Sequence, residues 1–198
     1  MLLHEKLKAY HLILASQSPR RRELLSGCGL PYVLAPHYAV EELYPADLPV
    51  AEVPEYLSHL KSNLFPRALT TGEILLTADT VVIAKGLILG KPKDREDALR
   101  MLRMLSGTTH TVVTGVTLRS MERQSSFSAH SMVTFRTLTD EEMIYYIDTF
   151  QPYDKAGSYG VQEWIGYAAI EHLEGSFYNV MGLPIQRVYI ELEKFIAL

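Results

Sequence analysis

The chain has 198 residues, of which 47% are hydrophobic and 21% are charged, with a formal net charge of −4 at pH 7. This composition excludes a disordered tail and argues against a general nucleic-acid binder, which would carry a positive surplus. A single cysteine, Cys28, excludes an internal disulfide and a cysteine-based zinc cluster, and it fits a reducing cytosol. No stretch approaches the ~18 apolar residues needed to cross a bilayer, so we expect one cytoplasmic domain spanning residues 1–198.

The first third of the sequence predicts two short strands and two helices. Ser18 can cap a helix, Pro19 suits its first position and Gly27 suits its end. An acidic, proline-containing stretch between positions 38 and 54 indicates a loop, and Pro66 should end or kink the helix that follows it. The expected elements are a strand at 11–16, a helix at 18–27, a strand at 31–36 and a helix at 55–69.

The rest of the sequence predicts a central strand followed by helices and a hairpin. The nearly continuous apolar run that begins at residue 73 is typical of a strand covered on both faces. Asp94 can cap the next helix, and Thr139 with Glu142 forms a capping box. The further expected elements are a helix at 94–107, hairpin strands at 110–120 and 126–138, a helix at 140–150, a strand at 166–175 and a helix at 182–196. This order predicts an α/β fold with a mixed sheet.

Residues 12–27, "LILASQSPRRRELLSG", place three consecutive arginines at the start of a predicted helix. A helix N-terminus has unpaired N–H groups and a partial positive charge, so cations there are unfavourable unless an anion compensates them. Arginine suits phosphate oxygens because its donors form a planar fork, and the Ser16 hydroxyl can donate as well. Since successive helical residues diverge by about 100°, one or two of the three arginines should face such an anion. The alternative is a solvated basic face.

Asp79 is a lone carboxylate inside the apolar stretch "EILLTADTVVIA". Burying it without a partner would be costly. Such a carboxylate either holds Mg²⁺ or acts as a base in phosphate chemistry, or it is a structural residue held by backbone N–H groups. Thr80 beside it is either a strand-forming residue or a hydroxyl directed at a ligand. The residues alone leave these alternatives open.

Other candidate residues carry weaker signals. Lys91 lies in "LGKPKD", where Pro92 precedes a helix and favours a positioned cation. Gln162, in the glycine-rich "YDKAGSYGVQ", offers an amide that can bind a base edge, although a simple turn is the alternative. Lys61 and the loop glutamates at 41 and 42 resemble ordinary solvated charges. The sequence has no P-loop, GxGxxG, GxSxG or HExxH motif.

Six segments match one family in order and spacing, from about residue 12 to the final helix. They are "LILASQSPRRRELL", "ADTVV", "GKP", "LSGTTHTVVTGV", "YDKAGSYGVQ" and "EGSFYNVMGLPI". Together they resemble the Maf family, the septum-formation-inhibitor-like nucleotide pyrophosphatases. The resemblance implies an elongated mixed sheet flanked by helices, with two lobes around a central cleft, akin to the inosine triphosphate pyrophosphatases. It also implies hydrolysis of a nucleoside triphosphate to the monophosphate and pyrophosphate with a divalent cation, Mg²⁺ or Mn²⁺.

The resemblance also assigns roles to individual residues. Asp79 matches the family's proton acceptor, and Lys61 and Lys91 match its two cleft lysines. A glutamate of the acidic loop, either Glu41 or Glu42, matches a carboxylate that positions metal or water. The residues that match the phosphate-binding SxSPR motif, together with one neighbour, are Ser16, Arg20 and Arg21.

Three positions are similar to one branch of the family. That branch has an arginine after SP, a threonine after the aspartate and a glutamine after YG[IV], which are Arg20, Thr80 and Gln162 here. It is associated with dTTP and UTP, whereas the sister branch, with SDQ in place of ADT, is associated with 7-methyl-GTP. The sequence therefore resembles the pyrimidine branch, but it has Glu163-Trp164 where a glycine is common.

The implied reaction is physically reasonable for these residues. A nucleoside triphosphate carries roughly four negative charges near neutral pH, and cations stabilise the charge that shifts to the leaving pyrophosphate. Asp79 would either accept a proton from water or hold the metal that acidifies it. The implied partner is the nucleotide, without nucleic acid or membrane, and family members are often homodimers.

A non-catalytic nucleotide sensor that regulates cell division through a protein partner is the competing hypothesis. A sensor could keep the phosphate-binding residues and lose Asp79, so the carboxylate and both lysines favour the enzyme. A nucleic-acid-binding module is a weak third idea, because one arginine cluster on an acidic chain cannot follow a nucleic-acid backbone.

Overall fold

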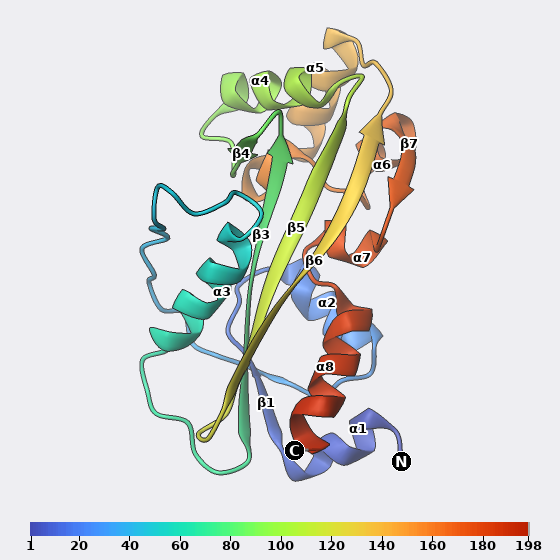
Figure 1. Cartoon of the computed structure of the whole chain (residues 1–198). Helices are drawn as coiled ribbons and strands as arrows, with labels where there is room; N and C mark the ends of the chain where they lie inside the picture. The colour runs from blue at the N-terminus through green and yellow to red at the C-terminus, as the bar shows by residue number, and fades with distance from the viewer. Residues whose placement is uncertain (198) are drawn as a thin grey trace. The chain divides into compact units, whose positions relative to one another are not determined.

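Strands and helices alternate along residues 1–197, the part of the chain that the computed structural model describes (Figure 1). The strands are β1 (His11–Leu14), β2 (Val33–Leu34), β3 (Glu73–Ala84), β4 (Leu87–Leu89), β5 (Thr109–Arg119), β6 (Gln124–Phe135) and β7 (Ile170–Glu174). The helices are α1 (Leu3–Lys6), α2 (Pro19–Gly27), α3 (Val53–Asn63), α4 (Arg95–Leu105), α5 (Asp140–Phe150), α6 (Trp164–Ala169), α7 (Phe177–Met181) and α8 (Ile185–Ala197). Short 3₁₀ turns cover Leu7–Ala9, Pro152–Asp154 and Ala156–Ser158.

All seven of these strands belong to one mixed sheet. Their order is β2-β1-β3-β5-β6-β7, and β4 pairs with β3 outside this path. Strand β1 runs parallel to β2 and β3, whereas β4 and β7 run antiparallel to β3 and β6. The predicted α/β class with a mixed sheet flanked by helices is therefore confirmed. Within residues 1–197, no helix is both long and apolar enough to span a bilayer.

The chain divides into two compact units, each made of segments that are discontinuous in sequence. Unit 1 comprises Met1–Asp79, Thr114–Ala129 and Gly182–Leu198, and unit 2 comprises Thr80–Val113 and His130–Met181. The division falls inside strands β3, β5 and β6, which agrees with the absence of a linker sequence. A single domain over residues 1–198 stays a prediction.

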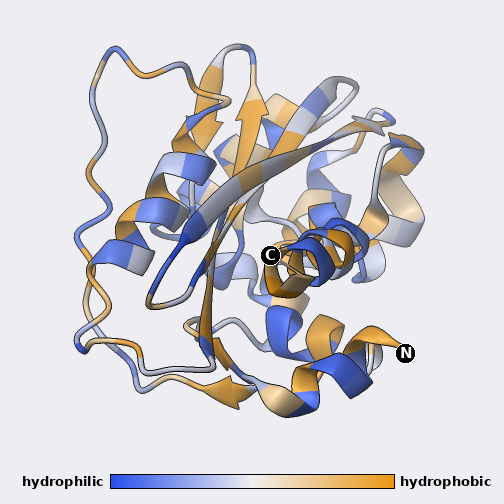
Figure 2. Cartoon of the chain, turned by 60° about the horizontal axis from the view of Figure 1, so that its bottom comes forward, coloured by the Kyte–Doolittle hydropathy of each residue, from blue (hydrophilic) through white to orange (hydrophobic). Residues whose placement is uncertain are grey.

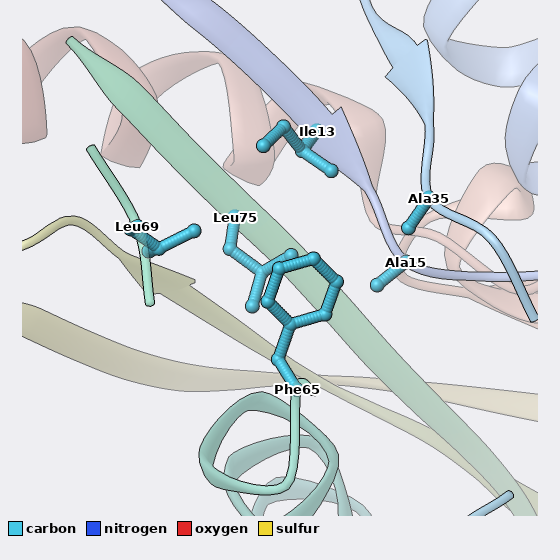
Figure 3. Close-up of a cluster of buried hydrophobic side chains, with 6 residues drawn as sticks. All are labelled: Ile13, Ala15, Ala35, Phe65, Leu69 and Leu75. Atoms are coloured by element: carbon cyan, nitrogen blue, oxygen red, sulfur yellow. The ribbon is translucent and has the colours of Figure 1, made fainter. Parts of the chain in front are cut away.

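Unit 1 has a hydrophobic cluster beside the first half of β3 (Figure 3). Ile13, on β1, and Ala15, directly after it, both belong to the cluster because alternate side chains of extended backbone point to the same face. Phe65 and Leu69, in the loop after α3, close the cluster, and Tyr38 packs edge-on against Phe65 with ring centroids 5.6 Å apart. The buried members are Ile13, Ala15, Ala35, Phe65, Leu69 and Leu75.

Helix α8 completes unit 1 and contacts the first helix of the chain. Its buried residues, Ile185, Val188, Leu192 and Phe195, recur at the spacing of one helical face. Figure 2 shows both hydrophobic and hydrophilic residues on this helix. The ammonium of Lys6 pairs with Glu193 at 2.5 Å, which joins the two ends of the chain.

Unit 2 contains the helices whose starts the sequence predicts most clearly. The Asp94 carboxylate accepts a hydrogen bond from the backbone N–H of Asp97 at 2.8 Å and caps α4. Thr139 and Glu142 form the reciprocal capping box of α5. Both caps satisfy N–H groups that lack partners inside the helix.

Several segments differ from the sequence prediction. Residues 166–175 were expected to form one strand, but α6 ends at Ala169 and only Ile170–Glu174 is extended. Ile165 and Ala169 are buried while Tyr167 is exposed, which is a helical rather than an alternating pattern. The short α1, β4 and α7 are not predicted by the sequence, and the helix predicted at 55–69 is Val53–Asn63, so it ends before Pro66. Strand β4 arises because Lys85 and Gly86 both adopt positive φ and form a tight hairpin turn.

A buried histidine in unit 2 makes stability depend on pH. The Nε2 atom of His110 lies 2.8 Å from the Tyr159 hydroxyl, and the ring packs edge-on against Phe135. Burial lowers the pKa of His110 to about 4, so the folded protein keeps this ring neutral where an unfolded chain would take up a proton. Its stabilising effect is present above about pH 6.5 and is lost as the pH falls toward 4.

We expect the free energy of unfolding to decrease by about 2 kcal/mol between pH 7 and pH 5 through His110. Urea titrations of the wild type and of His110→Gln at both pH values measure this contribution. The exposed His4→Gln is the control and should keep the wild-type pH dependence. An equal pH dependence in His110→Gln and the wild type would contradict the assignment.

Candidate active site

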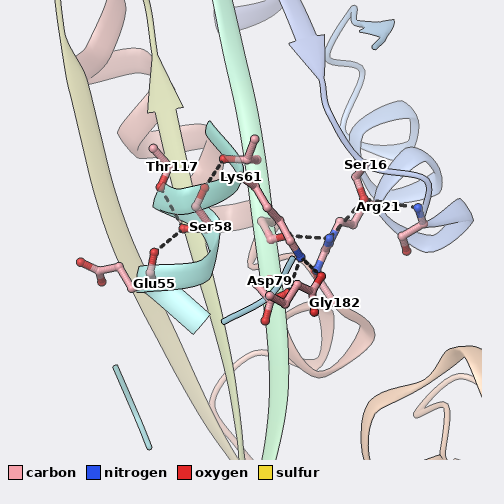
Figure 4. A network of polar contacts seen from close by, with 12 residues as sticks. Ser16, Arg21, Glu55, Ser58, Lys61, Asp79, Thr117 and Gly182 are labelled. Atoms are coloured by element: carbon pink, nitrogen blue, oxygen red, sulfur yellow. Dashed lines mark hydrogen bonds and ion pairs between the residues drawn. The ribbon is translucent and has the colours of Figure 1, made fainter. Parts of the chain in front are cut away.

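Asp79 is the last residue of β3 that belongs to unit 1, and the residue as a whole is only 8% exposed. Its Oδ1 atom lies 2.6 Å from the Nζ atom of Lys61, which projects from the last turn of α3 (Figure 4). A buried carboxylate needs such a partner, because an unpaired charge in the interior is strongly unfavourable. The lone carboxylate in the apolar strand is thus explained by a lysine 18 positions earlier in the chain.

Lys61 contacts a second carboxylate. Its Nζ atom lies 2.7 Å from Oε1 of Glu42, in the acidic loop, while the Lys61 backbone carbonyl accepts a 2.8 Å hydrogen bond from the Tyr38 hydroxyl. Both loop glutamates are exposed, and Glu42 is the one whose side chain contacts Lys61. One ammonium lies between two carboxylates, which brings two negative groups close together.

Arg21 joins three segments around Asp79 (Figure 4). Its guanidinium donates to Ser16 Oγ at 3.1 Å, to the carbonyl of Ala78 at 2.8 Å and to the carbonyl of Gly182 at 2.8 Å. Burial lowers the pKa of Arg21 below its ordinary value, and the charge of Asp79 opposes this effect. The planar guanidinium is thereby fixed beside the catalytic candidate. Which of the three arginines face a bound anion stays a prediction.

Arg20 and Ser16 complete the unit 1 part of the predicted site. The positive charge of Arg20 lies close enough to lower the pKa of Arg21 further. Ser16 Oγ accepts from the backbone N–H of Ser18 at 3.3 Å as well as from Arg21. Because both of these bonds use oxygen lone pairs, the hydroxyl proton of Ser16 can still be donated to a ligand.

Helix α3 is held against the sheet by buried hydroxyl groups. Thr77, on β3, donates to the Ser58 carbonyl at 2.7 Å, and Ser58 Oγ lies 2.8 Å from Oγ1 of Thr117 on β5. Ser58 and Thr117 are drawn with the site in Figure 4. These bonds fix helix α3 against the sheet, so the backbone of Lys61 is held in place by the core.

Three of the predicted site residues belong to unit 2. Thr80 follows Asp79 directly on β3 and is half-buried, Lys91 is exposed after β4, and Gln162 is half-buried after the 3₁₀ turns. The side-chain oxygen of Gln162 is buried and has no hydrogen-bond partner within residues 1–197. An unpaired buried amide oxygen is unfavourable on its own, which fits an amide that awaits a ligand. The assignment of these three residues to the site stays a prediction.

A polar network beside Gln162 was not anticipated from the sequence. The ammonium of buried Lys155 pairs with Asp154 at 2.7 Å and with Glu163 at 3.0 Å. The Tyr146 hydroxyl accepts from the backbone N–H of Gly160 at 2.9 Å and donates to the Glu163 carboxylate. Glu163 therefore contacts Lys155 directly and Gly160 through Tyr146, and both of these residues precede Gln162 in the chain. In the sequence, Tyr146 looks like any core residue of an amphipathic helix.

We expect Tyr146→Phe to lower the free energy of unfolding by about 1–3 kcal/mol, because it removes the partner of the Gly160 N–H and of one carboxylate oxygen of Glu163. The neighbouring Tyr145→Phe is a matched control, since Tyr145 is exposed and contacts Trp164 through its ring. Chemical denaturation of both variants gives the comparison. Equal losses in the two variants would show that the network is not stabilising.

The protein is of the α/β class, and its mixed sheet carries a buried carboxylate, Asp79, that is paired with Lys61 and lies beside Arg21. A family profile described as Maf-like protein matches residues 11–195. The chain belongs to the Maf family.

Individual relatives are similar along nearly the whole chain. A protein named dTTP/UTP pyrophosphatase from Bacteroides thetaiotaomicron is 55% identical over 188 residues, which cover 95% of this chain and 97% of the relative. A protein of the same name from Porphyromonas gingivalis is 52% identical over 193 residues, covering 96% and 97%. Among solved structures, a HAM1 protein from Coxiella burnetii has a TM-score of 0.46 and 14% identity, covering 93% of this chain and 99% of that one.

Proposed function

We propose that this protein is a nucleoside triphosphate pyrophosphatase that hydrolyses dTTP and UTP, or modified pyrimidine nucleotides, to the monophosphate and pyrophosphate. The observation that carries the proposal is the placement of Asp79 beside Lys61, Glu42 and Arg21. A carboxylate that can accept a proton then lies among cations that can bind phosphate. The names of the Bacteroides and Porphyromonas relatives support the same substrates.

In the proposed reaction, a water molecule attacks a phosphorus atom of the anhydride between the α- and β-phosphates, and its proton moves to a carboxylate oxygen of Asp79. The P–O–P bond breaks, and the monophosphate and pyrophosphate leave. Lys61 is held between two carboxylates and can donate to a phosphate oxygen once the nucleotide arrives. Arg20, Arg21 and the Ser16 hydroxyl would neutralise and orient the phosphates, with Lys91 as a second lysine. Thr80 and Gln162 would contact the pyrimidine.

A divalent cation, Mg²⁺ or Mn²⁺, fits the carboxylates of this site. Asp79 and Glu42 share one ammonium and can supply oxygen ligands, as such hard cations prefer. No group of three or more histidine, cysteine, aspartate or glutamate side chains suited to a metal lies within residues 1–197, so phosphate and water oxygens would complete the coordination. When bound, the cation would neutralise phosphate charge. We further propose a cytoplasmic protein that forms a homodimer.

Pyrophosphate release from a panel of nucleoside triphosphates, with and without Mg²⁺ or Mn²⁺, tests the proposal. We expect turnover of dTTP and UTP that requires the cation and exceeds turnover of purine nucleotides and of 7-methyl-GTP. Binding of dTTP without any turnover would contradict the enzyme and support a nucleotide sensor that acts on cell division.

Arg20→Ala should reduce kcat/KM for dTTP by about 10- to 100-fold, because a hydrogen bond to a charged group is worth about 1.5–3 kcal/mol. Steady-state pyrophosphate release measures the effect. Arg22→Ala removes the same charge two residues further along α2 and serves as the control. Equal kinetics of Arg20→Ala and Arg22→Ala would return the arginine run to a solvated face.

A further inference from the structure

A pocket in unit 1 is lined by none of the residues assigned to the active site. It has a volume of about 400 Å³ and lies between the loop after α3 and the turn that joins β5 to β6. Its walls are formed by three apolar residues of the loop, two arginines and two residues of the turn. They are Phe65, Arg67, Ala68, Leu69, Arg119, Ser120 and Met121. This volume falls within the range of pockets that bind small molecules.

The two arginines of the pocket differ in their partners. Arg67 is paired, because its two terminal nitrogens donate to both carboxylate oxygens of Glu73 at 2.8 Å and to the Ala68 carbonyl at 2.9 Å. The Nε atom of Arg119, by contrast, is buried and has no hydrogen-bond partner within the described residues 1–197. Burial lowers the pKa of Arg119 below its ordinary value, and Tyr38 opposes this effect only in its ionised form. An unpaired guanidinium N–H that is shielded from water is unfavourable, and an anion would remove that penalty.

One wall of the pocket is apolar and is held by the core of unit 1. Phe65 and Leu69 are 8% and 7% exposed and belong to the hydrophobic cluster of Figure 3, so they form a fixed wall. Met121, at 58% exposure, offers a flexible apolar side chain at the turn. A ligand that satisfies both parts needs an anionic group for Arg119 and an apolar ring or chain for this wall.

We propose that this pocket binds a small organic phosphate or carboxylate, whose anionic group pairs with Arg119 and whose apolar body packs against Phe65 and Leu69. The planar guanidinium suits both anions, since each presents two oxygens to its parallel donors. This ligand is additional to the nucleotide of the active site, and the proposal does not depend on the reaction.

Titrations of the full ¹⁵N-labelled chain with phenyl phosphate, benzoate and inorganic phosphate test the proposal. With phenyl phosphate or benzoate, we expect saturable shifts of the Arg119 Nε–H signal and of the backbone amides of 65–69 and 119–121. The response to phenyl phosphate compared with benzoate distinguishes the two anion classes. Inorganic phosphate, which lacks an apolar body, should bind this pocket at least tenfold more weakly.

Two variants and a control keep the result specific. Arg119→Gln should weaken the binding that these amides report by at least tenfold. Ala68→Glu, at an exposed position that lines the pocket, should weaken it as well, because its carboxylate would compete with the ligand for Arg119. Lys8→Gln removes a surface charge elsewhere in unit 1 and should bind as the wild type does.

Absence of shifts at 65–69 and 119–121 at saturating ligand, or unchanged binding in both variants, would overturn the proposal. Pyrophosphate release should be unaffected by Arg119→Gln, so this outcome is separable from the proposed function.

Discussion

Asp79→Asn should lower kcat for dTTP by about 10²- to 10⁴-fold, because a positioned general base contributes acceleration of that order. The amide has nearly the same shape as the carboxylate but cannot accept the proton of water. Lys61 would keep its 2.7 Å ion pair with Glu42, so the substitution does not leave the ammonium without a charged partner. We therefore expect a folded protein that binds nucleotide and turns it over very slowly.

Single-turnover pyrophosphate release and nucleotide binding by calorimetry separate these effects. Asp47→Asn is the matched control, because it makes the same change at an exposed position of the acidic loop in the same unit. It should retain wild-type kcat and Tm. A near-normal rate for Asp79→Asn would remove Asp79 from the proton-transfer step and leave it as the structural partner of Lys61.

Gly115→Ala should lower the free energy of unfolding by about 3 kcal/mol, at the upper end of the usual cost of overpacking. A Cβ atom at Gly115, on β5, would lie far inside van der Waals contact with the backbone of Pro54 and Glu55. Backbone atoms cannot rotate away as a side chain can, so the first turn of α3 must move. Because Lys61 projects from the same helix, kcat should fall along with stability.

Urea denaturation and pyrophosphate release together test this expectation. Gly27→Ala is the control, since nothing lies within 4 Å of a Cβ atom at the end of α2. That variant should be as stable as the wild type or slightly more stable. A Gly115→Ala protein with wild-type stability and activity would show that the contact between β5 and α3 relaxes without cost.

Elements with a local chemical signal could be predicted from the sequence. Asp94 and the pair Thr139 and Glu142 mark helix starts, because each carries the group that satisfies the first N–H groups of its own helix. Strand β4 escaped detection since Lys85 adopts a positive φ that its residue type rarely signals. The sequence predicts a strand where α6 lies, because six residues are too few to distinguish the helical period of about 3.6 residues from the strand period of about two.

The candidate site shows a similar division. Asp79 could be predicted as a site residue because a carboxylate in an apolar strand needs a partner, but its neighbours in the sequence do not identify that partner. Lys61, which contacts it at 2.6 Å, looks like a solvated helix lysine in sequence, and only the family resemblance assigned it a role. The choice of Glu42 over Glu41 as the contact of Lys61 depends on the path of a loop, which tertiary contacts determine.

The hydrogen bonds of Arg21 also constrain when the site can form during translation. Arg21 is made early, but one of its acceptors, the Gly182 carbonyl, belongs to the last segment of unit 1. The residues of unit 2 have all been synthesised before that segment emerges from the ribosome. A chain that ends before residue 182 would therefore lack the Gly182 carbonyl that accepts from Arg21, and Arg21 would be less firmly held beside Asp79. Such a truncated chain would contain all of unit 2 but only part of unit 1.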